Sequence, residues 1–215
     1  MDLSKRLLGY YDYTVVLTYC GMLFAVLGIF DVFQGNFLRA AICLMMAGVC
    51  DMFDGAVAAT KERTPSEKCF GIQIDSMCDL ISFGILPALF MYFIMEQSIL
   101  AKGIAALYIL CALIRLSYFN VLEEERQKQT TERRTSYLGV PVTTIAVLLP
   151  AVFALYDFRL IRSRLAFPIL LTVCAAGFLS RIEIRKPHVI GKIVMIVMDL
   201  VEMAGLLFLM GADPL

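Results

Sequence analysis

Long apolar segments dominate this sequence of 215 residues and restrict the folds that it can adopt. Of its residues, 60% are hydrophobic and 18% are charged, whereas a soluble domain is typically about 45–50% apolar and about 25% charged. A helix needs about 20 largely apolar residues to span a bilayer. Seven segments approach that length: residues 14–33, 37–58, 70–95, 99–121, 140–156, 165–180 and 189–210. The sequence therefore predicts an all-α fold, a polytopic integral membrane helical bundle with six to seven transmembrane helices.

Most of the charged residues lie between the apolar segments, and they do not form a separate domain. We therefore interpret the chain as a single membrane-embedded domain, with a cytosolic juxtamembrane segment (1–13), a core (14–156) and C-terminal helices (157–215). Membrane lipids are the expected neighbours of its apolar surface. The sequence has neither a basic domain nor a basic stripe with interleaved aromatic residues, so no nucleic-acid partner is expected.

Two polar runs are predicted to be loops. Residues 60–68 contain Pro65 as a helix breaker, and residues 123–134 are the most charged stretch of the chain. Both runs contain several lysine and arginine residues, which the positive-inside rule associates with cytosolic loops. The link at 157–164 also holds three arginines, yet with seven spans it falls outside the cytosol, in conflict with that rule. Pro87 is expected to kink the third span.

Four aspartates lie at the adjoining ends of the second and third apolar segments. Asp51 and Asp54 are three residues apart, and Asp75 and Asp79 are four apart, so on helices each pair projects from one face. Two consecutive helices can aim all four carboxylates at one point at the cytosolic mouth. Carboxylates this close need partners of opposite charge. A pair of hard divalent cations, which take oxygen ligands, is the expected partner.

The stretch from Asp51 to Asp79 resembles the signature of the CDP-alcohol phosphotransferases. That signature reads Asp-x-x-Asp-Gly-x-x-Ala-Arg, a spacer of eight residues, and Gly-x-x-x-Asp-x-x-x-Asp. The matching positions are Asp51, Asp54, Gly55, Ala58, Gly71, Asp75 and Asp79. The resemblance implies a membrane-embedded enzyme that transfers a substituted phosphate group from a CDP-activated donor to an alcohol.

The chain departs from the signature in two ways. The arginine position holds Ala59, and the spacer from Thr60 to Phe70 has eleven residues instead of eight. Lys61 or Arg63 can supply the missing positive charge from the longer loop. Alternatively, the change marks a catalytically inactive homologue.

Further runs are similar to one branch of the family, the phosphatidylserine synthases. These runs are residues 70–84, 114–121 and 137–141, and the resemblance covers about residues 12–150. It implies that the hydroxyl of L-serine attacks the β-phosphorus of CDP-diacylglycerol, so that CMP leaves and phosphatidylserine forms. It also implies a homodimer. The lysines and arginines of the loops place the active site on the cytoplasmic side, and we expect the membrane to be a bacterial cytoplasmic membrane.

On the donor side, the resemblance gives the four aspartates the role of ligands for two Mg²⁺ or Mn²⁺ ions, with Asp79 also the catalytic base. Gly55, Ala58 and Gly71 would line the nucleotide side, because small residues let a bulky group approach the backbone. Thr18, near the cytosolic start of the first span, is a further candidate for nucleotide binding.

On the acceptor side, the candidates are Arg115, Asn120 and Tyr137. The planar guanidinium of Arg115 suits the carboxylate of serine, although snorkelling to the interface explains an arginine there equally well. Glycerol phosphate, inositol phosphate and ether-lipid donors remain alternatives within the same chemistry. A cation channel or transporter is the alternative of another class, but such a pathway predicts acids spread across the bilayer.

Overall fold

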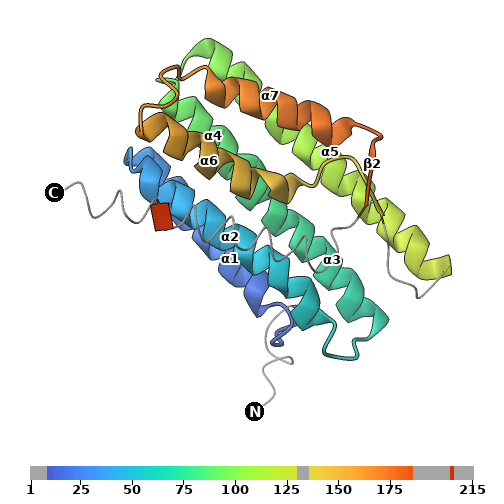
Figure 1. Cartoon of the computed structure of the whole chain (residues 1–215). Coiled ribbons are helices and arrows are strands. Elements are labelled where there is room, and N and C mark those ends of the chain that lie inside the picture. The colour runs from blue at the N-terminus through green and yellow to red at the C-terminus, as the bar shows by residue number, and fades with distance from the viewer. Residues whose placement is uncertain (1–8, 130–135, 186–203, 206–215) are drawn as a thin grey trace.

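A computed structural model describes residues 9–129, 136–185 and 204–205, which form a bundle of helices connected at its two ends (Figure 1). The helices are α1 (Val16–Phe33), α2 (Phe37–Ala58), α3 (Pro65–Asp79), α4 (Leu86–Ile94), α5 (Ile99–Gln129), α6 (Ile145–Asp157) and α7 (Ala166–Leu179). A π-helical segment, η2 (Leu80–Ile85), joins α3 to α4, and a 3-10 segment, η3 (Val142–Thr144), precedes α6. Two short strands, β1 (Ser136–Leu138) and β2 (Glu183–Arg185), pair antiparallel.

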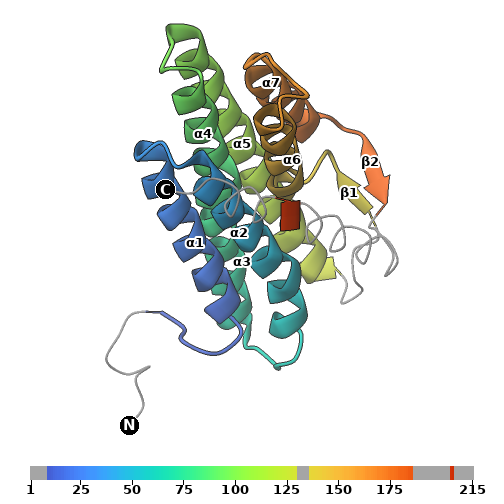
Figure 2. The same cartoon turned by 60° about the vertical axis from the view of Figure 1, so that its left-hand side comes forward.

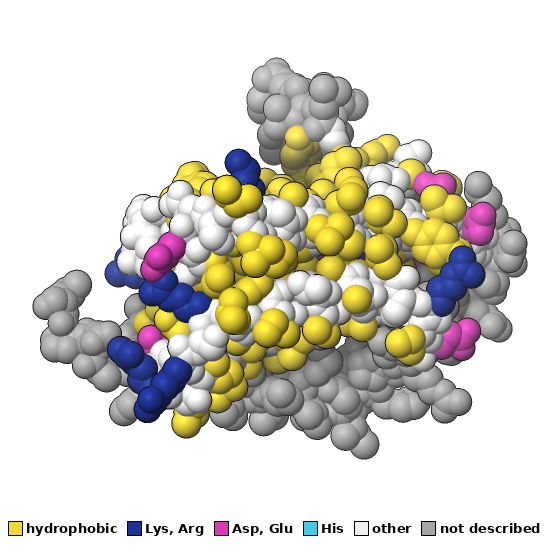
Figure 3. All heavy atoms as spheres, turned by 90° about the horizontal axis from the view of Figure 1, so that it is seen from above, with side chains coloured by type: hydrophobic (Ala, Val, Ile, Leu, Met, Phe, Trp, Pro, Cys, Tyr) yellow, Lys and Arg dark blue, Asp and Glu magenta, His cyan; other side chains and the backbone are white. Residues whose placement is uncertain are grey.

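The helices have the length and surface of membrane spans. Four stretches are long and apolar enough to cross a bilayer, namely Val16–Phe33, Phe37–Ala58, Pro65–Ile94 and Ile99–Arg126, and two shorter apolar helices follow. Figure 3 shows exposed hydrophobic side chains across the middle of the molecule and charged side chains toward its ends. The prediction of a polytopic helical membrane protein is therefore confirmed. The seventh predicted span, 189–210, lies almost wholly outside the described residues.

The third span begins earlier than the sequence suggested. Pro65 was expected to interrupt helix within a loop, but it is the first residue of α3. The Thr64 hydroxyl accepts a hydrogen bond from the Glu67 backbone (3.3 Å), and the Glu67 carboxylate accepts one from the Thr64 backbone (2.7 Å). This capping box satisfies backbone donors, and proline has no N–H to lose at that position. The loop prediction was therefore wrong from residue 65 onward.

The charged run after the fourth span is also partly helical. α5 continues to Gln129, so the prediction of a solvated loop over 123–134 was wrong for its first seven residues. Glu123 and Arg126, three residues apart, form an ion pair at 2.5 Å, a spacing that supports helix on a solvated surface.

The arginine-rich link at 157–164 lies at the end of the bundle opposite the α2–α3 connection (Figure 1). The conflict with the positive-inside rule therefore persists in the structure. The guanidinium of Arg164 is paired there with the carboxylate of Glu96 and donates to the Tyr156 hydroxyl at 3.2 Å.

Small residues let α1 and α2 pack closely, and the two helices lie side by side in both views (Figure 1, Figure 2). A Cβ placed on Gly28 would come within 2.9 Å of the Cys43 Cβ, and one on Gly21 within 3.2 Å of the Cys50 Cβ. Close approach through small residues is a common way for membrane helices to associate. This antiparallel register brings the start of α1 against the end of α2, where the aspartates lie.

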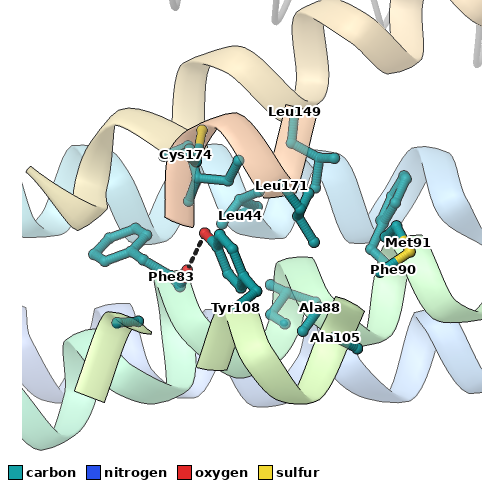
Figure 4. Packing of buried hydrophobic residues seen from close by; sticks show 14 of the residues in the cluster. Leu44, Phe83, Ala88, Phe90, Met91, Ala105, Tyr108, Leu149, Leu171 and Cys174 are labelled. Atoms are coloured by element: carbon teal, nitrogen blue, oxygen red, sulfur yellow. Dashed lines mark hydrogen bonds between the residues drawn. The ribbon is translucent and has the colours of Figure 1, made fainter. Parts of the chain in front are cut away.

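A break in the helical hydrogen bonding follows the last aspartate. Pro87 has no N–H, so it cannot bond the carbonyl of Phe83 four residues earlier. The buried Tyr108 hydroxyl of α5 donates to that carbonyl at 2.8 Å (Figure 4). The π-helical geometry of η2 lies at this point, as expected where the normal ladder is interrupted. The Tyr108 contact thereby ties the segment directly after Asp79 to the core.

We expect Tyr108→Phe to destabilise the protein by about 1–3 kcal/mol, because a buried carbonyl loses a donor while the packing volume stays almost constant. Unfolding of the purified protein in detergent, followed by circular dichroism, measures this change. Tyr118→Phe is the matched control, since Tyr118 lies on the same helix and is 57% exposed. Equal stabilities of the two variants would contradict the interpretation.

Candidate active site

The ends of α2 and α3 bring three carboxylates together. One oxygen each of Asp51, Asp54 and Asp75 can be chosen so that all three lie within 4.8 Å of one another. All three side chains are half-buried. Three mutually close carboxylate oxygens from two helices suit a hard divalent cation.

Asp79 lies one turn beyond Asp75 on α3 and extends the cluster inward. Its carboxyl group lies against that of Asp51 and acts electrostatically on the other two aspartates. The guanidinium of Arg115, from α5, is the neighbouring positive charge. Arg115 is 9% exposed, and its guanidinium carbon lies 5.9 Å from the centre of the Phe119 ring. The predicted acceptor-binding arginine is therefore close enough to act electrostatically on the aspartate cluster.

Thr18 contacts the cluster directly. Its hydroxyl donates to a carboxylate oxygen of Asp54 at 3.1 Å, and the residue is buried. The sequence pointed to Thr18 as a nucleotide contact, whereas its hydrogen bond here orients one of the carboxylates.

Ser76 links the third and fifth helices and was missed in the sequence analysis. Its hydroxyl donates to the side-chain oxygen of Asn120 at 2.8 Å. The missed signal was its position directly after Asp75, inside the matched motif. Tyr137 lies in β1, where its backbone pairs with Ile184, but its side chain is outside the part of the chain that the structure describes.

The small residues of the motif differ in what surrounds them. A Cβ on Gly55 would meet nothing within 4 Å, so the space beside it is open. A Cβ on Gly71 would lie 2.9 Å from Nη1 of Arg63. Ala58 is the last residue of α2 and is half-buried.

An ionic network fixes the N-terminal segment against the α2–α3 connection. The Lys61 ammonium pairs with Asp12 at 2.7 Å and with Glu67 at 3.2 Å. Hydrogen bonds from Lys61 and Thr14 lower the pKa of Asp12 from 3.8 to about 2. The hydrogen bonds that Lys61 donates to the carboxylates of Asp12 and Glu67 raise its pKa. Lys61 therefore stabilises the connection, and its charge is committed to these partners.

Comparison with known proteins agrees with this geometry. Residues 14–182 match the family described as CDP-alcohol phosphatidyltransferase. The chain belongs to this family. The match includes all four aspartates and every helix from α1 to α7.

Several relatives in this family carry the name CDP-diacylglycerol--serine O-phosphatidyltransferase. The chain is 32% identical to the Saccharomyces cerevisiae protein over 53% of this chain and 41% of the relative. It is 28% identical to the Bacillus subtilis protein over 79% and 84%, and 28% identical to the Methanocaldococcus jannaschii protein over 88% and 79%. The chain covers about half the length, 41% and 55%, of the yeast relative and of one from Helicobacter pylori.

We expect Lys61→Met to release the N-terminal segment and to accelerate amide exchange of Thr14, whose N–H donates to Asp12 at 2.8 Å. Hydrogen exchange with mass spectrometry measures this change, with the exposed Lys68→Met as control. Because the folded pKa of Asp12 is lowered, the contribution of the pair is present above about pH 4 and is lost as the pH falls through about 2. Unchanged protection in Lys61→Met would contradict this role.

Proposed function

We propose that the protein transfers the phosphatidyl group of CDP-diacylglycerol to the hydroxyl of L-serine, giving phosphatidylserine and CMP. The convergence of Asp51, Asp54 and Asp75 at one end of the bundle is the observation that carries this proposal. The names of the relatives point to serine as the acceptor.

The four aspartates fit a pair of divalent cations, Mg²⁺ or Mn²⁺. Asp51, Asp54 and Asp75 offer oxygens close enough for shared ligation, and Asp79 adjoins Asp51. When bound, such ions would neutralise the diphosphate oxygens and the charge that develops on the departing CMP. The Thr18 hydroxyl orients Asp54 for this role.

Asp79 is the base in this proposal. Its carboxylate accepts the proton of the serine hydroxyl as the hydroxyl oxygen bonds to the β-phosphorus. The bond between that phosphorus and the bridging oxygen breaks, and the oxygen leaves with CMP. Arg115 is the positive charge that acts on Asp79, in a buried environment where charges interact more strongly than in water. Arg115 can therefore hold the carboxylate of the acceptor with its hydroxyl within reach of Asp79.

The acceptor side would consist of Arg115, Asn120 and Tyr137. Arg115 can bind the serine carboxylate through two parallel hydrogen bonds. Asn120 is held by Ser76, which leaves its amide nitrogen for the acceptor. Arg115 is buried within the protein, and burial favours substrate binding over snorkelling, which needs a side chain exposed toward the lipid headgroups.

We place the site on the cytoplasmic side of a bacterial cytoplasmic membrane, in a homodimer. The α2–α3 connection beside the aspartates contains Lys61 and Arg63, as the positive-inside rule requires there. The diacylglycerol chains of the donor would lie among lipids against the apolar helices, while its headgroup reaches Gly55, Ala58 and Gly71.

We expect the purified protein to release CMP from CDP-diacylglycerol in the presence of Mn²⁺ and L-serine, and Asp79→Asn to lower this rate by about 10²–10⁴-fold through loss of the base. Chromatography of CMP and of the lipid product measures both. Asp157→Asn, an exposed carboxylate at the opposite end, is the matched control.

Glycerol phosphate and inositol phosphate serve as competing acceptors in the same assay, and an ether-linked donor tests the lipid. CMP release that depends on one of these acceptors and not on serine would overturn the proposed substrate. An Asp79→Asn variant as active as the unchanged protein would overturn the proposed base.

A further inference from the structure

The α2–α3 connection presents one guanidinium to the active site. Nη1 of Arg63 lies against Gly71, where a Cβ would be only 2.9 Å away. Gly71, Asp75 and Asp79 follow one another at intervals of four residues and therefore share one side of α3. Arg63 thus lies beside the aspartate face, about 6 Å, or four residues, before Asp75 along the helix.

The other charges near this connection already have partners. Lys61 is paired with Asp12 and Glu67. The Glu67 carboxylate also accepts a hydrogen bond from the Thr64 N–H, as part of the capping box at the start of α3. Within the residues that the structure describes, Arg63 has no ion-pair partner. Its charge is therefore available for a ligand.

The backbone around Arg63 is firmly held. Thr60 donates to the Val57 carbonyl at 2.7 Å and bonds the Tyr13 hydroxyl at 3.1 Å. The capping box then fixes Thr64 at the start of α3. A guanidinium on a connection anchored at both ends can bind an anion with little loss of backbone entropy.

We infer that Arg63 binds a phosphate oxygen of the donor's diphosphate, and so replaces the positive charge that the family signature carries at position 59. An anion held at the aspartates through cations, and extending one turn toward the start of α3, would reach this guanidinium. Ala59 is exposed and uncharged, and the three extra residues of the connection set Arg63 over Gly71. This inference rests on the proposed function, because it assumes a CDP-activated donor.

Binding of CDP to the purified full-length protein in detergent with Mn²⁺ and no acceptor, measured by calorimetry, tests the inference without turnover. We expect Arg63→Ala to weaken CDP binding about 10- to 100-fold, the effect typical of losing a charged hydrogen bond. Arg63→Lys should retain part of the affinity, because it keeps the charge but not the planar fork. Arg162→Ala, an exposed arginine at the opposite end, should bind CDP like the unchanged protein.

A second variant separates this role from a general effect on folding. Adding Ala59→Arg to Arg63→Ala should restore CDP affinity at least in part, which a damaged fold could not do. CDP binding by Arg63→Ala within twofold of the unchanged protein would overturn the inference, and so would a double variant no tighter than Arg63→Ala.

Failure of the inference can be told from failure of the proposed function. If serine does not stimulate CMP release but CDP binding depends on Arg63, the acceptor is wrong and the inference stands. If serine stimulates CMP release while Arg63→Ala changes neither CDP affinity nor the KM for the donor, only the inference fails.

Discussion

The fold has to hold the carboxylates of Asp51, Asp54, Asp75 and Asp79 close together against their mutual repulsion. Like charges this close, half withdrawn from water, separate or bind protons unless the fold holds them and cations neutralise them. The fold supplies the first condition. Small residues set the register of α1 against α2, so that Thr18 reaches Asp54. The capping box at Thr64 and the Tyr108 contact at Phe83 fix the helical stretch that carries the other two aspartates.

Much of this arrangement could be predicted from sequence because its signals are local. The apolar lengths identified the membrane helices, and the spacing of Asp51 and Asp54 and of Asp75 and Asp79 placed each pair on one face. The convergence of the pairs followed from the short connection between their helices. The start of α3 was missed because Pro65 was read as a breaker, although proline is equally suited to the first turn of a helix.

The remaining features depend on contacts between residues distant in sequence. The bond between Ser76 and Asn120 joins residues 44 positions apart, and that between Thr18 and Asp54 joins residues 36 apart. The sequence left Lys61 and Arg63 as equal candidates for the charge missing at Ala59. The structure separates them, because Asp12, distant in the chain, engages Lys61 and leaves Arg63 facing Gly71. Only the folded chain carries that information.

We propose that the aspartate cluster holds two divalent cations beside a diphosphate. Titration of the purified protein with Mn²⁺ in the presence of CDP, followed by electron paramagnetic resonance, measures the number and affinity of these ions. We expect two bound Mn²⁺ per chain. We expect Asp75→Asn to lose more than about tenfold in Mn²⁺ affinity, because losing a ligand costs at least as much as losing a residue that supports one. Asp157→Asn should bind like the unchanged protein. No specific Mn²⁺ binding, or equal binding by Asp75→Asn, would rule out this metal site.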